Sequence, residues 1–116
     1  CGFRAQHELV MHFTNGSPEY HDASTGNVLK SSRVNHQARE HQTQKPVDLI
    51  ERLIRVVCPP GGTVLDPFIG SGTTALAALN TGRQCIGIER DENYFNIACR
   101  RVTEALDKTA LIDQEH

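Results

Sequence analysis

In the second half of the chain, apolar residues recur every three or four positions in three segments, a spacing that places them on one face of a helix. The first predicted helix begins at Pro46, which suits a first helical turn, and ends at residues 58–62, Cys-Pro-Pro-Gly-Gly. The second spans about residues 71–80 and is ended by Gly82. The apolar face of the first helix comprises Val47, Ile50, Leu53, Ile54 and Val57, and that of the third comprises Tyr94, Ile97, Ala98, Val102, Ala105 and Leu106.

Two short apolar runs, residues 63–66 and 84–88, lie between these helices. Runs of this length without polar alternation predict strands that are buried on both faces. The resulting order, helix–strand–helix–strand–helix, indicates an α/β unit with parallel strand pairing and right-handed crossovers.

The two ends of the chain follow different patterns. Residues 15–42 are polar and lack an apolar period, which predicts a long or disordered loop. Residues 107–116 predict a polar tail. The segment 7–14 alternates apolar with polar positions and predicts a further strand, with one face formed by Leu9, Met11 and Phe13.

Composition narrows the functional classes. The net charge of −2 and the pI of about 6.3 argue against a free-standing nucleic-acid-binding module. The four cysteines form no CxxC pair and the six histidines no HxxxH pair, so no metal site is expected and reduced thiols in the cytoplasm are favoured. No signal peptide or 18-residue apolar run occurs, so no membrane partner is expected. Because the chain begins with Cys1 and not with Met, we expect it to be a fragment whose upstream part is missing.

One local stretch is basic. Residues 27–45 contain one acidic residue, Glu40, and four basic residues, Lys30, Arg33, Arg39 and Lys45. Such a loop could contact phosphate groups, and each contact would add to a salt-dependent binding term. An ordinary solvated loop explains the same charges equally well.

The most informative stretch is the glycine loop that follows the first apolar run. Gly70, Gly72 and Ala75 fit the G-x-G-x-x-G/A pattern, and Glu89 follows at nearly the usual distance for a ribose partner. NAD, FAD and S-adenosylmethionine sites share this pattern. No lysine follows the glycines, so the loop is not a P-loop.

Asp66 distinguishes between these ligands. It is placed at the carboxyl end of the predicted strand, where a dinucleotide would bring an anionic pyrophosphate close to the carboxylate. Two like charges about 4 Å apart at an effective dielectric near 20 repel by roughly 4 kcal/mol. S-adenosylmethionine instead carries an ammonium and a sulfonium, which the same carboxylate attracts. The alternative for Asp66 is a turn or helix-capping carboxylate, and that for Glu89 is a solvated charge.

Three segments in this order resemble the amino-methyltransferases of DNA, which modify adenine N6 or cytosine N4. Residues 41–46, His-Gln-Thr-Gln-Lys-Pro, resemble their motif X, with Gln42 where the family usually has Pro. Residues 66–74, Asp-Pro-Phe-Ile-Gly-Ser-Gly-Thr-Thr, resemble motif I, and residues 87–94 resemble motif II. His7-Glu-Leu-Val resembles the strand that precedes the family's variable region.

The resemblance implies an S-adenosylmethionine site on a partial Rossmann-like fold with a mostly parallel sheet. Thr43 and Lys45 would reach the methionine carboxylate, and Glu89 would hold the ribose. Asp66, Gly70 and Gly72 would line the amino group and the backbone side of the methionine moiety. The full set of cofactor-binding residues that it implies is Thr43, Lys45, Asp66, Pro67, Phe68, Gly70, Ser71, Gly72, Thr73, Glu89 and Arg90.

The catalytic tetrapeptide of this family, Asp/Ser/Asn-Pro-Pro-Tyr/Phe/Trp, does not occur in the chain. Pro59-Pro60 is preceded by Cys58 and followed by Gly61, and it precedes the first apolar run. With motif X before motif I, the resemblance implies the β-class order and a catalytic motif upstream. Residues 1–116 are then expected to be the C-terminal cofactor-binding part of a methyltransferase domain, with a variable loop over 15–40 and the motifs over 41–106.

The expected function is therefore site-specific methylation of DNA by the intact protein. This chain lacks the catalytic motif and is expected to be inactive alone. The expected partners are double-stranded DNA, contacted mainly by the upstream part, and a second copy in a homodimer, in the cytoplasm. Three alternatives stay open: a non-catalytic cofactor-binding remnant, an NAD- or FAD-binding oxidoreductase domain, and a methyltransferase acting on RNA or a small molecule.

Overall fold

The computed structural model describes residues 8–32 and 44–114. Their helices and strands alternate in the predicted order. They are α1 (Val47–Val57), β1 (Thr63–Asp66), α2 (Thr73–Asn80), β2 (Gln84–Gly87) and α3 (Glu92–Gln114).

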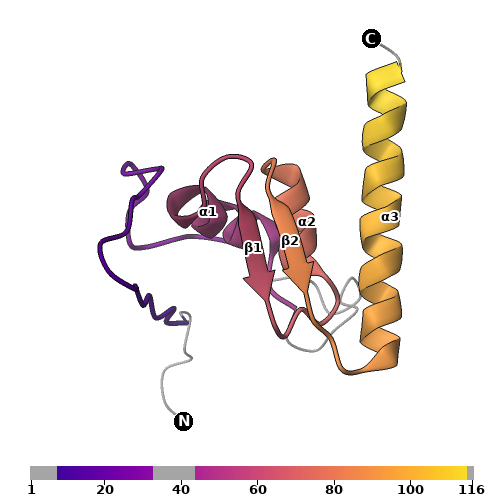
Figure 1. Ribbon diagram of the computed structural model, residues 1–116, viewed down its shortest axis with the longest axis horizontal. Coiled ribbons are helices and arrows are strands. Elements are labelled where there is room, and N and C mark those ends of the chain that lie inside the picture. The colour runs from indigo at the N-terminus through magenta and orange to yellow at the C-terminus, as the bar shows by residue number, and fades with distance from the viewer. Residues whose placement is uncertain (1–7, 33–43, 115–116) are drawn as a thin grey trace.

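The two strands pair in parallel, with Thr63 opposite Gln84 and Asp66 opposite Gly87. Figure 1 shows α1 and α2 behind this sheet and α3 standing beside α2. Each strand is followed by a helix, which is the α/β arrangement that the sequence predicts, and the parallel pairing is confirmed. Both strands therefore end at the same edge of the sheet, where the glycine loop begins.

A small core lies between the sheet, α1 and α2. Two adjacent alanines of α2, Ala77 and Ala78, are completely buried, and their short side chains let α2 approach its neighbours closely. Arg83 closes one end of this core, since its Nη2 donates to the Cys58 carbonyl at 2.8 Å. The rest of the core consists of Ile54 and Cys58, with Val47, Ile50, Val64 and Cys85 packed against it.

The other face of the sheet is open, and the prediction of strands buried on both faces is wrong for the described chain. Successive side chains of a strand point to opposite faces. Val64 and Cys85 face the helices, so their neighbours Leu65 and Ile86 point away from them and are 63% and 57% exposed. In Figure 1 the arrows of both strands have no helix in front of them.

The strand predicted over residues 7–14 is also not formed in its described part, residues 8–14, which contain neither helix nor strand. Leu9, Met11 and Phe13 are all largely exposed. A strand is stabilised by hydrogen bonds to a neighbouring strand, and the only strand pairing among the described residues joins β1 to β2. Alternating apolar residues alone are not sufficient.

The described part of the polar stretch, residues 15–32, is a loop, as predicted. It lies against α1, since the His21 amide donates to the Val56 carbonyl at 2.8 Å and the Ser31 hydroxyl to Asp48 at 2.8 Å. Inside the loop, hydrogen bonds from Ser24 and Thr25 lower the pKa of Asp22. Lys30 is exposed, and its predicted phosphate contact stays a prediction, while Arg33 and Arg39 lie outside the described residues.

The helices differ from the sequence predictions at three points. The predicted polar tail is helical over residues 107–114, which continue α3, because nothing between Glu92 and Gln114 is a glycine or proline that would end the helix. The second helix begins at Thr73 and not near Ser71, since the left-handed Gly72 precedes it. The sequence places Val57 and Leu106 on the apolar faces of the first and third helices, but each is about half exposed.

The environments of the described cysteines predict their order of reactivity. Cys58 is buried, Cys85 is half-buried and Cys99 is exposed on α3. Burial raises the pKa of the Cys85 thiol, and the charge of Asp66 raises it further, so less of the reactive thiolate is present near neutral pH. We expect iodoacetamide to modify Cys99 well before Cys85 and Cys58, as followed by peptide mass spectrometry. The order should vanish in urea, and faster modification of Cys85 in the folded chain would contradict it.

Candidate functional site

The glycine loop, residues 67–72, joins the end of β1 to the start of α2. Gly70 and Gly72 have φ angles of 56° and 88°, in the left-handed region that favours glycine. The loop also follows β2, because the Ile69 amide donates to the Ile88 carbonyl at 3.1 Å. The loop is thus held at the edge of the sheet where both strands end.

Asp66 stabilises the first turn of this loop. Its Oδ1 accepts a hydrogen bond from the Phe68 amide at 3.0 Å, and its Oδ2 accepts one from the Thr74 hydroxyl at 2.6 Å. The carboxylate therefore has the turn role that the sequence left as an alternative. It also borders a cavity, described below, and each carboxylate oxygen keeps a lone pair for a further donor.

Glu89 connects the end of β2 to the loop. Its Oε2 accepts from the Gly70 amide at 2.9 Å, and its Oε1 accepts from the Asp91 amide at 2.8 Å. The side chain is partly buried and is therefore not the solvated charge of the alternative interpretation. Both oxygens retain acceptor capacity, so a contact to ribose hydroxyls stays a prediction.

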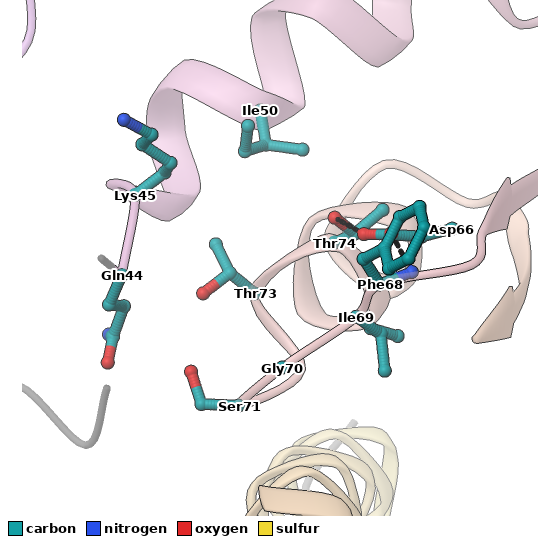
Figure 2. Close-up of a pocket in the computed structure, with 10 residues that line it drawn as sticks. All are labelled: Gln44, Lys45, Ile50, Asp66, Phe68, Ile69, Gly70, Ser71, Thr73 and Thr74. Carbon is teal, nitrogen blue, oxygen red and sulfur yellow. Dashed lines mark hydrogen bonds between the residues drawn. The ribbon is translucent and has the colours of Figure 1, made fainter. Parts of the chain in front are cut away.

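A cavity of about 150 Å³ lies between the start of α1 and the glycine loop. It is smaller than the roughly 300–1,000 Å³ of complete small-molecule sites, so it would take only part of a large ligand. Figure 2 shows the hydroxyls of Ser71 and Thr73 pointing into the same space beside Gln44. The lining residues are Gln44, Lys45, Ile50, Asp66, Phe68, Ile69, Gly70, Ser71, Thr73 and Thr74.

The Thr73 hydroxyl is the polar group in this cavity that most clearly needs a hydrogen-bond partner. Thr73 is only 8% exposed, and among the described residues its Oγ1 has no hydrogen-bond partner. Leaving a buried hydroxyl unpaired costs about 1–3 kcal/mol. A polar ligand atom in the cavity would remove this cost.

Lys45 borders the cavity, but its ammonium forms an ion pair with Glu8. Both side chains are largely exposed, and exposed pairs of this kind contribute only about 0–1 kcal/mol. The ammonium can therefore exchange Glu8 for a ligand carboxylate at little cost. Thr43, its predicted companion, lies outside the described residues.

Gly72 does not line the cavity; it faces α3. A Cβ atom at this position would lie 3.0 Å from both Cα and Cβ of Ala98. The absence of a side chain thus lets α3 pack directly on the loop. The predicted contact of Gly72 with a cofactor stays a prediction.

Some of the remaining predicted residues line the cavity and others do not. Gly70, Ser71, Thr73 and the 87% exposed Phe68 line the cavity, whereas the exposed Pro67 and Arg90 do not. Sequence reasoning missed Thr74, although a hydroxyl in the first turn of a helix behind a carboxylate is a recognisable signal. It also missed Gln44, Ile50 and Ile69, whose residue types carry no such signal.

Two further observations concern only the described part of the chain. It contains no group of three or more histidine, cysteine, aspartate or glutamate side chains that could hold a metal ion. None of its helices is both long and apolar enough to span a membrane.

Comparison with known proteins links this geometry to one family. Residues 2–100 match the N6/N4 methyltransferase model, described as DNA methylase. The chain is 40% identical over 100 residues to the type II methyltransferase M2.DpnII of Streptococcus pneumoniae, covering 86% of this chain and 36% of that protein. It is 42% identical over 91 residues to the DNA adenine methyltransferase YhdJ of Escherichia coli K12, covering 76% of this chain and 31% of that protein. The chain spans about a third of the length of these curated relatives.

Solved structures give the same result for the fold. The M1.HpyAVI–SAM complex is 36% identical with a TM-score of 0.62, over 72% of this chain and 43% of that one. The S-adenosylmethionine complex of TTHA0409 from Thermus thermophilus is 42% identical with a TM-score of 0.50, over 52% of this chain and 25% of that one. The predicted partial Rossmann-like methyltransferase fold is therefore confirmed.

Proposed function

The chain belongs to the DNA methylase family, and on this premise we propose that it forms the S-adenosylmethionine-binding part of a DNA amino-methyltransferase. When bound, S-adenosylmethionine supplies the methyl group that the exocyclic amine of a DNA base accepts. Adenine N6 is the favoured acceptor, because one relative is named as a DNA adenine methyltransferase. Double-stranded DNA as partner, a homodimer and a cytoplasmic location are parts of the same proposal.

The observation that carries the proposal is the buried hydroxyl of Thr73, which has no partner among the described residues and lies in a cavity at the carboxyl end of β1. The cavity also presents the Ser71 hydroxyl and the carboxylate of Asp66. Hydroxyl donors suit the carboxylate of an amino-acid moiety, and a carboxylate suits its ammonium. The residues present thus fit the methionine end of S-adenosylmethionine, with Glu89 beside the loop for the ribose.

The same residues fit a dinucleotide poorly. Among the described residues, Lys45 is the one cation that borders the cavity. It is paired with Glu8, and Asp66 lies opposite. A pyrophosphate placed here would meet a carboxylate without a compensating excess of positive charge. This argues against the NAD- or FAD-binding alternative.

Calorimetric titration of the purified chain tests the proposal. We expect S-adenosylmethionine and S-adenosylhomocysteine to bind, and NAD and FAD to give no heat at the same concentrations. Binding of a dinucleotide without binding of S-adenosylmethionine would overturn the assignment and restore the oxidoreductase alternative.

Thr73→Val tests whether the observed hydroxyl contributes. Valine has nearly the same shape, so the substitution removes the hydroxyl while keeping the packing of α2. We expect the affinity for S-adenosylhomocysteine to fall about fivefold to tenfold, the effect of one lost hydrogen bond. Thr109→Val on the exposed part of α3 is the matched control and should bind like the wild type. An unchanged affinity in Thr73→Val would show that this hydroxyl does not contact the ligand.

A further inference from the structure

Helix α3 contacts the glycine loop through a polar side chain as well as through Ala98. Arg101 lies one turn beyond Ala98 on α3 and is partly buried. Its Nη1 donates to the Ser71 carbonyl at 2.7 Å and to the Ser71 hydroxyl oxygen at 3.0 Å. Ser71 is 3% exposed and stands between two left-handed glycines.

This contact restrains the part of the loop that has the most conformational freedom. Gly70 and Gly72 can adopt many backbone conformations, so Ser71 between them is held by tertiary contacts and not by its own dihedral preferences. The Ser71 carbonyl lies just before α2. The hydrogen-bond ladder of this helix begins with the Leu76 amide donating to the Gly72 carbonyl, one residue after Ser71. A charge-assisted bond from Arg101 therefore fixes a carbonyl that the helix does not use.

The second bond determines what the Ser71 hydroxyl can do. A hydroxyl has one proton to donate, and its oxygen here already accepts from a guanidinium. Its proton is therefore directed away from Arg101 and is available to an acceptor. Figure 2 shows the Ser71 oxygen on the cavity side of the loop, beside the Thr73 hydroxyl.

We propose that Arg101 is a positioning residue of the cofactor site, which fixes the glycine loop and directs the Ser71 hydroxyl proton toward the methionine carboxylate of the ligand. The proposal rests on the proposed function, since it assigns the end of the cofactor that faces Ser71. Arg101 acts through Ser71 and touches no reacting atom.

Two ligands that differ only in the amino-acid end make this testable. S-adenosylhomocysteine carries the amino acid, whereas 5′-methylthioadenosine has the same adenosine and sulfur without it. In Arg101→Ala we expect the affinity for S-adenosylhomocysteine to fall about tenfold, as for loss of a hydrogen bond to a charged group. The affinity for 5′-methylthioadenosine should stay within about twofold, and Arg101→Lys, which keeps one charged donor, should recover part of the loss.

The matched control is Arg100→Ala, because Arg100 is the adjacent residue on α3, exposed, and paired with Glu104 on the surface. It should bind both ligands like the wild type. Hydrogen exchange of the ligand-free chain adds an independent measurement, since Arg101→Ala should accelerate exchange in the peptide covering residues 70–74 and Arg100→Ala should not.

The outcomes separate the two proposals. Suppose that the wild type binds both ligands. If Arg101→Ala weakens the affinity for both equally, or weakens neither, the positioning role is overturned while the cofactor site stands. If Arg101→Ala does not fold, the same comparison is made with Arg101→Lys, and equal weakening of both ligands again overturns the role. If the folded wild type binds neither ligand, the proposed function fails and the role of Arg101 fails with it.

Discussion

Gly72→Val is expected to displace α3 from the glycine loop and to abolish measurable binding of S-adenosylmethionine. Two physical costs combine at this position. The φ angle of 88° is unfavourable for any residue with a Cβ and most so for a β-branched one. The new Cβ would also lie 3.0 Å from Cα and Cβ of Ala98, and the Cα belongs to the helix backbone. Helix α3 must therefore move as a unit.

Backbone strain of about 1–3 kcal/mol and overpacking of about 1–3 kcal/mol predict a loss of roughly 2–6 kcal/mol in the free energy of unfolding. Such a loss is a large share of the stability of a small domain. Urea unfolding measures the loss of stability, and calorimetric titration of S-adenosylmethionine measures the loss of binding.

Gly82→Val is the matched control for this substitution. Gly82 has a φ angle of 69°, and a Cβ built on it meets no atom within 4 Å. The control therefore carries the backbone strain without the collision. We expect it to lose stability by only about 1–3 kcal/mol and to keep its ligand affinity. Equal effects of the two substitutions would show that the contact with Ala98 is unimportant.

Gly72 also shows how far the sequence could predict the site. The spacing of the glycines identified the loop correctly, because a tight turn after a strand requires residues that adopt positive φ angles. The sequence predicts that Gly72 lines the ligand, and that contact stays a prediction. The structure shows a second reason for the glycine, because Ala98, a residue 26 positions away, fills the space that a Cβ would need. No local pattern indicates which neighbour will fill such a space.

Arg101 was missed for a related reason, although a signal was present. The predicted apolar face of α3 includes Ala98, Val102 and Ala105, and Arg101 falls within it at a spacing of three from Ala98. A charged residue on an apolar face is more informative than another apolar one, because burying it requires a partner. Its partner, the Ser71 carbonyl and hydroxyl, became visible only in three dimensions.

The errors about strands have a different cause. Local apolar patterns predicted β1 and β2 correctly, since each is a short run between helix signals. Whether a strand face is buried depends on what covers it, and Leu65 and Ile86 are uncovered among the described residues. Residues 8–14 likewise have an alternating pattern but no strand beside them. Pattern determines which side chains share a face, whereas burial depends on the rest of the fold.

Glu89→Ala is expected to reduce the affinity for S-adenosylhomocysteine by about 100-fold, which corresponds to losing two hydrogen bonds to a charged acceptor. The carboxylate would bind the ribose with the acceptor capacity that its bonds to Gly70 and Asp91 leave unused. The affinity of Glu89→Gln should lie between those of the wild type and Glu89→Ala. The amide keeps one oxygen, but it places an NH₂ group against a backbone donor. Glu92→Gln, an exposed change in the first turn of α3, is the control and should bind normally.

The pair of ligands used for Arg101 separates two ways in which Glu89 could act. If Glu89 binds the ribose, S-adenosylhomocysteine and 5′-methylthioadenosine should weaken by similar factors, since both contain the ribose. If Glu89 acts only through the Gly70 amide, it would hold the glycine loop as Arg101 does, and the loss would be confined to S-adenosylhomocysteine. That result would contradict the ribose contact and make Glu89 a second support of the loop. Calorimetry on the same four variants, wild type, Glu89→Ala, Glu89→Gln and Glu92→Gln, decides between the two roles.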